Sequence, residues 1–150
     1  MSEPSGPLLT DILSWAMSFA TQLGVVVHSG RVKLDQKAIA FFEAVDPYLL
    51  HSCEVNEWPG TRLIGARLGI VRIYALTPEF AEIFKNTGDA LYMWVNPYLP
   101  EDPHLLRADG SVLLGTVTQE RDGWMELSED EFSSLVREVP WMATVLEQRS

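Results

Sequence analysis

The densest group of titratable side chains outside the predicted helices lies in a proline-fenced loop at residues 97–103 and in the histidine that follows it. Glu101, Asp102 and His104 carry the carboxylate and imidazole groups that bind catalytic metal ions and transfer protons. A hydrolytic metal site needs about three protein ligands and an open position, but adjacent residues of an extended chain point in opposite directions. The loop alone therefore supplies at most two ligands. Further donors would come from Glu54, Glu57, Glu120 or His51.

The competing interpretation of this loop is electrostatic. In that case Glu101 and Asp102 lie at the surface, where they cap backbone N–H groups or pair with Arg107 and Arg121 and present negative charge to a partner. The sequence favours this interpretation, because nothing in the spacing brings a third ligand to the loop. We predict no metal, no cofactor and no catalytic residue.

His51-Ser52-Cys53 is the other stretch whose residue types suggest chemistry. Residues two apart on a strand share a face, so His51 and Cys53 are placed as an imidazole–thiol pair. The sequence supplies no third group to orient the histidine, and negative local charge raises a thiol pKa instead of lowering it. We therefore predict a buried structural cysteine. The sequence contains no phosphate-binding glycine loop, dinucleotide fingerprint, Gly-x-Ser-x-Gly or His-Glu-x-x-His. An enzyme is the weaker hypothesis.

The composition is typical of one globular domain. With 150 residues, 47% of them hydrophobic, and five Trp, the chain can bury a core without a disulfide or a structural metal. Residues 1–7 are small, polar and proline-rich, which predicts a flexible arm before a single domain at 8–150. Polar residues interrupt the first apolar segment, so it fits neither a signal peptide nor a membrane span, and a cytoplasmic protein is expected.

The formal net charge of −10 arises from 21 acidic and 11 basic residues. Such a field repels nucleic acid and anionic lipid, so we expect neither as a partner. It attracts a protein partner with a basic surface. Solubility is the alternative explanation of the acidity.

Helix signals occur in five places. An apolar stripe at 3–4 residue spacing predicts a helix over 8–23, closed by Gly24 and either buried against a sheet or used as a partner-binding or dimer face. Asp35, Thr77 and Ser128 are capping residues that predict helices over 36–46, from 78 to a stop at 86–88, and over 129–138. Pro140 precedes a last short helix.

Strand signals predict the sheet. The predicted strands are 50–58 at an edge or lining a groove, 68–76 in a central position, 90–95, 105–107, 111–120 and 124–127. Arg72 interrupts the central strand and is expected to pair with a carboxylate or to reach a groove. Asp109-Gly110 and Asp122-Gly123, thirteen residues apart, predict two hairpin turns. The fold class is α+β: one domain with a mainly antiparallel sheet of about five or six strands and helices packed chiefly on one face.

Three short patterns resemble a diffuse set of small uncharacterised bacterial proteins: Trp-Pro-Gly-Thr at 58–61, Leu-Pro-Glu-Asp at 99–102 and Arg-x-Asp-Gly at 107–110. A strand ending in His-Glu would complete the pattern, and here that strand ends in Gln119-Glu120. The resemblance therefore carries over no proton-transfer or metal role. It covers about the C-terminal half of the chain and implies no established activity. In size and acidity the chain is also similar to immunity proteins that neutralise bacterial toxins.

These observations predict a non-catalytic protein-binding module, with an immunity-type protein that neutralises a basic partner such as a toxin as its most concrete form. The interface candidates are aromatic residues beside turns together with acidic residues of the loop and the last capped helix: Trp94, Glu101, Asp102, Trp124, Glu129, Asp130 and Glu131. One alternative is an enzyme or ligand-binding protein with an acidic groove near Pro97–Pro103, drawing on Glu101, Asp102, Glu120, His51 or Arg72. The other is a homo-oligomeric structural protein that associates through the 8–23 stripe.

Overall fold

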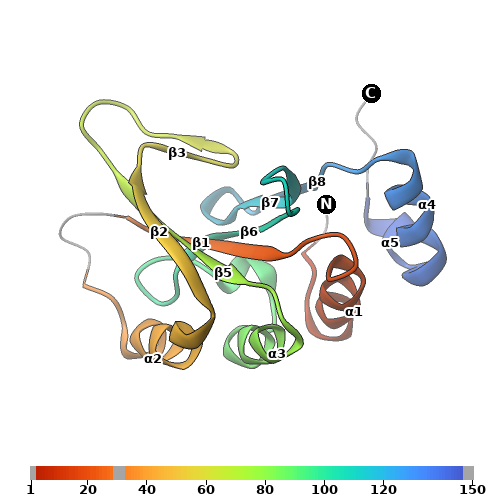
Figure 1. Cartoon of the computed structure of the whole chain (residues 1–150), viewed down its shortest axis with the longest axis horizontal. Helices are drawn as coiled ribbons and strands as arrows, with labels where there is room; N and C mark the ends of the chain where they lie inside the picture. Colours follow the sequence, from red (N-terminus) through yellow and green to blue (C-terminus); the bar gives the residue numbers. More distant parts are fainter. Residues whose placement is uncertain (1–2, 29–32, 147–150) are drawn as a thin grey trace.

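The computed structural model describes residues 3–28 and 33–146 (Figure 1). Its α-helices are α1 Gly6–Ala16, α2 Gln36–Val45, α3 Pro78–Thr87, α4 Glu129–Glu138 and α5 Met142–Val145. Short 3-10 turns are η1 Asp46–Tyr48, η2 Leu91–Met93 and η3 Thr118–Glu120. The strands are β1 Gln22–His28, β2 Leu49–Val55, β3 Glu57–Trp58, β4 Thr61–Arg62, β5 Gly69–Ala75, β6 Glu101–Leu106, β7 Val112–Val117 and β8 Asp122–Met125. This is a single-domain α+β fold, as the sequence predicts.

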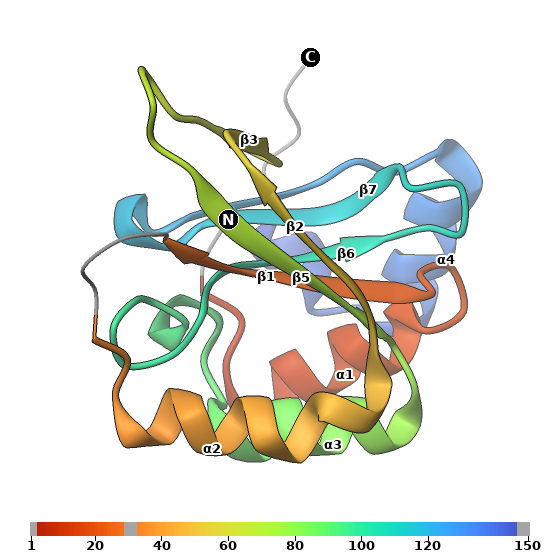
Figure 2. The ribbon, with the colours of Figure 1, turned by 60° about the vertical axis from the view of Figure 1, so that its left-hand side comes forward.

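Six strands form one antiparallel sheet in the order β2-β5-β1-β6-β7-β8, so β2 and β8 are its two edges. The predicted edge strand and the predicted central strand are confirmed, since β5 lies between β2 and β1. Figure 2 shows α2 and α3 side by side beneath the sheet with α1 next to them, while α4 and α5 lie at the β8 end. The small β3–β4 hairpin belongs to an arm that projects from the other face.

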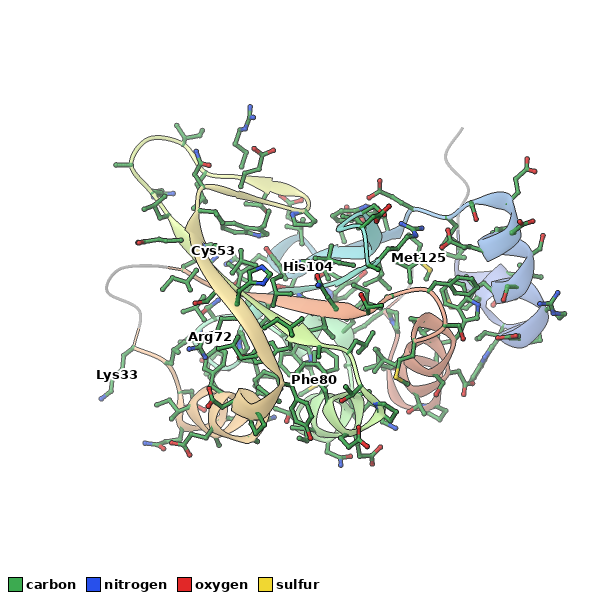
Figure 3. All side chains as sticks on the ribbon, in the orientation of Figure 1. Lys33, Cys53, Arg72, Phe80, His104 and Met125 are labelled. Atoms are coloured by element: carbon green, nitrogen blue, oxygen red, sulfur yellow. The ribbon has the colours of Figure 1, made fainter. Side chains whose placement is uncertain are left out.

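The main core fills the space between the sheet and its helical layer. Aromatic rings dominate it: Phe41, Phe80 and Phe84 lie on α2 and α3, and Trp94 stacks on Phe84 with ring centroids 4.1 Å apart. Figure 3 labels Phe80 in this layer, below the strands. Edge-to-face and stacked rings at these separations add to the burial of large apolar surfaces.

A second, smaller core lies on the opposite face of the sheet. Val26, Val71 and Ile73 point to this outer face, and Trp58 of the arm covers them with only 5% of its own surface exposed. Gly69 makes this contact possible, because a Cβ added there would stand 2.6 Å from Trp58 Cζ3. Trp58 is therefore the largest buried contact of the arm with the sheet, and Leu63 packs against the same outer core.

The first predicted helix ends earlier than expected. Helix α1 stops at Ala16, and β1 has already begun at Gln22. Ala20 and Leu23 are buried, so the helical spacing continues past the helix without a break. Gly24 is no helix cap, because it lies within β1. The 8–23 stripe is split between a buried helix face and a buried strand, which leaves no such stripe as a dimer face.

Two other local predictions are wrong. Residues 90–95 contain the turn η2, Leu91–Met93, and carry Trp94 into the core instead of adding a strand. Asp122-Gly123 lies within β8, and the chain turns earlier, through η3 and Arg121 at φ 52°. The Asp109-Gly110 turn is confirmed, with Gly110 at φ 85° and its N–H donating to the carbonyl of Arg107 at 2.9 Å.

The three predicted helix starts are confirmed. Asp35 accepts from the backbone N–H of Lys37, Thr77 accepts from that of Phe80, and Ser128 and Glu131 form a complete capping box.

Part of the predicted N-terminal arm is placed against the domain. Ser5 bridges to Ala90, and Glu3 accepts from the backbone N–H of Tyr92 at 3.0 Å. The predicted domain at 8–150 includes residues 29–32 and 147–150, which lie outside the described residues.

Candidate functional site

Glu101 is not a surface carboxylate. It opens β6 with only 3% of its surface exposed, because the strand begins inside the predicted loop. Its Oε2 lies 2.6 Å from Nε2 of His28, and its Oε1 accepts from Gln119 Nε2 at 3.0 Å and from the backbone N–H of Asn96 at 3.2 Å. Sequence reasoning missed His28 and Gln119. Their approach to Glu101 depends on strand pairing that no local pattern reveals.

Asp102 is equally buried and equally well bonded. Its Oδ2 accepts from Trp58 Nε1 at 2.9 Å, and its Oδ1 accepts from the backbone N–H and hydroxyl of Thr118 at 2.9 and 3.0 Å. Burial raises the pKa of Asp102, and these hydrogen bonds oppose that rise. Its φ of 51° places the backbone in the left-handed region, which Asp tolerates better than most residues. Asp102 thus joins the arm, β6 and η3.

His104 is only 2% exposed, and its Nδ1 donates to the carbonyl of Asp102 at 2.9 Å. Burial lowers the pKa of His104, which favours the neutral ring. The ring lies over Gly24, where an added Cβ would stand 2.2 Å from Nε2. Figure 3 labels this histidine at the centre of the sheet.

The proposed extra donors do not join this cluster. His51 and Glu54 are exposed on β2, Glu57 is exposed on β3, and Glu120 is exposed on η3. Within residues 3–28 and 33–146, no three His, Cys, Asp or Glu side chains gather closely enough to hold a metal ion. The carboxylate oxygens of Glu101 and Asp102 are occupied by protein donors. Glu101 and Asp102 therefore form a structural cluster where the sequence suggested an acidic groove.

Two further expectations are corrected. Cys53 is exposed instead of buried, because the outer side of the edge strand β2 is not covered by any described element. Arg72 pairs with no carboxylate among the described residues. Its guanidinium lies 4.5 Å from the ring centroid of Phe42 and contacts the hydroxyl of Tyr74 at 3.5 Å.

Four of the seven interface candidates are buried: Trp94, Glu101, Asp102 and Glu131. Trp94 is 0% exposed and donates from Nε1 to the carbonyl of Gly88 at 3.3 Å, and Glu101 and Asp102 are each 3% exposed. Aromatic and acidic residues beside prolines resemble surface loops in sequence, but here they fill the ends of the sheet.

The candidates that stay accessible lie together along the second edge of the sheet. Glu129 and Asp130 are exposed at the start of α4, directly after β8, and Trp124 lies half-buried on β8. Trp124 rests on Gly115, where a Cβ would stand 2.3 Å from its ring, and its Nε1 donates to Oε2 of Glu126 at 3.1 Å.

Sequence reasoning missed the rest of this surface. Glu120 and Glu126 are exposed and Asp122 is half-buried, and all three lie on or beside β8. We call the set Glu120, Asp122, Glu126, Glu129 and Asp130 the acidic edge. In the described part of the chain, none of these five carboxylates lies in an ion pair.

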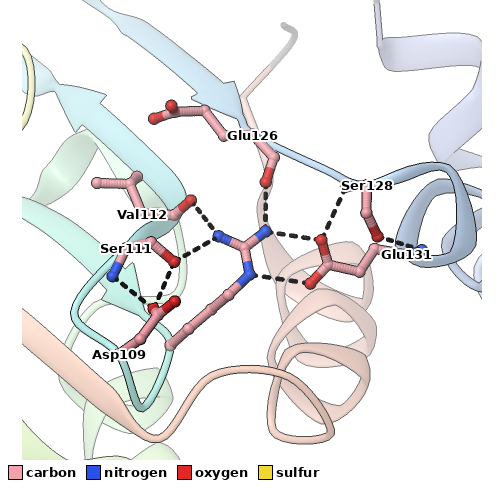
Figure 4. A network of polar contacts seen from close by, with 7 residues as sticks. Asp109, Ser111, Val112, Glu126, Ser128 and Glu131 are labelled. Carbon is pink, nitrogen blue, oxygen red and sulfur yellow. Dashed lines mark hydrogen bonds and ion pairs between the residues drawn. The ribbon is translucent and has the colours of Figure 1, made fainter.

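Glu131, the seventh candidate, points inward and holds the acidic edge in place. Arg107 donates to it from Nε at 3.0 Å and from Nη2 at 2.7 Å (Figure 4). The remaining N–H groups of Arg107 reach the hydroxyl of Ser111 at 3.2 Å and the carbonyls of Val112 at 2.7 Å and Glu126 at 2.5 Å. One guanidinium therefore ties the β6–β7 turn to the segment between β8 and α4, and its five donors are all engaged.

The C-terminal third of the sequence is also its most acidic part. Residues 101–150 contain eleven of the 21 acidic residues and only four of the 11 basic ones. Arg107 is paired with Glu131, and Arg121 with Glu3.

Comparisons of the chain with protein-family models, with curated proteins and with solved structures found no match. Among the described helices, none combines the length and the apolar character that crossing a membrane requires.

Proposed function

We propose that this protein is a non-catalytic, cytoplasmic protein-binding module whose acidic edge receives a basic protein surface. The observation that carries the proposal is the set of five unpaired carboxylates along β8 and the start of α4, beside the half-buried ring of Trp124. Unpaired charge of one sign steers an oppositely charged partner and accelerates its association. The ring of Trp124, beside these carboxylates, provides an apolar anchor for the partner.

The support from Arg107 fits this role. A recognition surface binds more tightly when its backbone is already fixed, because less conformational entropy is lost on binding. The capping box of Ser128 and the five bonds of Arg107 fix the corner between β8 and α4. The most concrete form of the proposal is an immunity-type protein that covers the basic surface of a toxin.

The test compares two variants of equal net charge. E129K/D130K reverses two carboxylates of the acidic edge, and E43K/E79K reverses two exposed carboxylates on α2 and α3. A basic protein that wild type retains from a lysate of its own cells is identified and purified, and its association rate is measured across ionic strengths.

We expect the association rate to fall as salt rises, and to fall about tenfold or more in E129K/D130K at low salt. E43K/E79K should associate at close to the wild-type rate. A rate that is independent of ionic strength contradicts the proposal, as does an equal loss in both variants.

A further inference from the structure

Strand β2 is a free edge of unusual exposure. It has seven residues and pairs only with β5 among the described strands. Its five central residues, Leu50 to Glu54, are all exposed, so neither face is covered. The backbone N–H and C=O groups on its outer side have no described strand to pair with. Such an edge is a template for another strand.

The segment around β2 also exposes apolar side chains. Leu50 is 51% exposed, Ile64 87% and Leu68 36%, and all three lie between β2 and the start of β5. Burying them removes apolar surface from water. The opposite edge differs, because β8 has only four residues and acidic neighbours.

The local charge around β2 favours a second copy of this chain as its partner. Residues 49–68 hold two acidic and two basic residues, Glu54, Glu57, Arg62 and Arg67, and are formally neutral in a chain of net charge −10. Two copies of such a chain repel each other over most of their surfaces. The β2 segment is where a second copy approaches with the least repulsion, whereas a strongly basic partner is drawn to the acidic edge instead.

We propose that two copies of this chain associate through antiparallel pairing of their β2 strands. The regular part of β2 defines the register. The pairing with β5 shifts between Leu49 and His51 and is regular from His51 to Val55, and Cys53 is the middle of that stretch. A two-fold axis at Cys53, perpendicular to the sheet, sets the two Cys53 residues opposite each other and sets Ser52 opposite Glu54 of the second copy. Both helical layers then lie on the same side of one continuous sheet.

This inference does not rest on the proposed function. The acidic edge lies at the far end of the sheet and stays accessible in both copies. A dimer of this kind presents two acidic edges to basic partners. If either proposal fails, the other stands, because one test measures partner binding at the β8 edge and the other measures dimer formation at the β2 edge.

The first test combines sedimentation equilibrium with thiol cross-linking. Opposed residues of antiparallel strands have Cα atoms about 4.5–5.5 Å apart, within the range that a disulfide spans. Diamide takes up the two thiol hydrogens and leaves a disulfide between two Cys53 residues. We expect a concentration-dependent dimer mass and rapid, near-complete cross-linking at Cys53. The control is C53S/S14C, which moves the only thiol to an exposed position on α1 and should cross-link slowly.

The second test uses the predicted register. S52K places a cation opposite Glu54 of the second copy, and S52E places an anion there. Each cross-strand charge pair occurs twice in the dimer, so S52E should weaken and S52K strengthen association by roughly two- to thirtyfold. S14E and S14K, which make the same changes on α1, should leave the dimer unaltered. A monomeric mass at every concentration overturns the proposal, as does a dimer in which Cys53 cross-links no faster than the control thiol.

Discussion

The two edges of the six-stranded sheet differ in almost every property that governs association. The β2 edge is long, formally neutral over residues 49–68 and partly apolar, whereas the β8 edge is short and flanked by unpaired carboxylates. In both, the outer backbone groups have no neighbouring strand among the described residues. We therefore propose different occupants for the two edges, because like-charged copies repel least at the neutral one and a basic partner is attracted to the acidic one.

Beside the strand pairing, one buried carboxylate with a nitrogen donor fastens the segment that adjoins each edge. On the β2 side, Trp58 of the arm donates to Asp102. On the β8 side, Arg107 donates to Glu131. In the Trp58–Asp102 pair an uncharged N–H donates to a buried carboxyl group, whereas the Arg107–Glu131 pair joins two opposite charges. The two edges should therefore respond differently to mutation and to pH.

The largest effect should follow removal of the anchor on the β2 side. Trp58 is 5% exposed and fills the outer core, so W58A should lower the free energy of unfolding by about 3–5 kcal/mol in urea denaturation. W58F keeps most of the ring volume and removes the N–H donor to Asp102, so it should cost about 1–2 kcal/mol. If W58A and W58F lost equal amounts of unfolding free energy, packing of the ring would not be the main contribution of Trp58 to stability.

On the β8 side, R107A should lower the free energy of unfolding by about 2–4 kcal/mol. The substitution leaves Glu131 without its cation and two carbonyls without donors. R137A, on the exposed side of α4, is the control and should change stability by less than about 0.5 kcal/mol. Chemical denaturation measures both. A loss in R107A no larger than in R137A would show that the five hydrogen bonds do not hold the corner.

The smallest effects should appear in the pH dependence, with opposite signs at the two edges. Burial raises the pKa of Asp102 in the folded protein, so this carboxyl favours the folded state at low pH and loses that contribution as pH rises through its folded pKa. The hydrogen bonds of Arg107 lower the pKa of Glu131, so its contribution is present above the unfolded pKa and is lost as pH falls through the folded one.

Each unit by which the folded and unfolded pKa values differ changes the free energy of unfolding by about 1.4 kcal/mol. The stability advantage of wild type over D102N should therefore grow as pH falls below neutral, and its advantage over E131Q should shrink. Urea denaturation of the three proteins across the acidic range measures these slopes. If the stability differences of D102N and E131Q from wild type changed with pH in the same direction, the opposite pKa shifts of Asp102 and Glu131 would be wrong.

Local signals in the sequence were sufficient for several elements. The caps at Asp35, Thr77 and Ser128 and the Asp109-Gly110 turn were predicted correctly, because each depends on contacts within a few residues. The helical stripe that ran on past Ala16 misled the prediction, because buried strand residues continued the same spacing. Asp122-Gly123 misled it as well, because the chain turned one step earlier at Arg121.

The candidate site could be predicted only in part. Glu129, Asp130 and Trp124 are accessible as expected, but Trp94, Glu101 and Asp102 are buried and Glu131 serves as a structural partner of Arg107. Residue type and proline spacing identified the chemistry of the 97–104 segment. They could not show that β6 begins at Glu101, since pairing with β1 decides this through residues more than seventy positions away.

The sequence by itself determined an acidic α+β domain with a sheet, capped helices and a strand suited to an edge, because composition, periodicity and capping act over short distances. Only the tertiary structure decided which carboxylates face water. Long-range strand pairing gave Glu101 and Asp102 donors from His28, Gln119, Trp58 and Thr118, whereas no carboxylate of the acidic edge lies in an ion pair within the described residues. A carboxylate contributes to structure or to recognition according to the donors around it, and those donors come from distant parts of the chain.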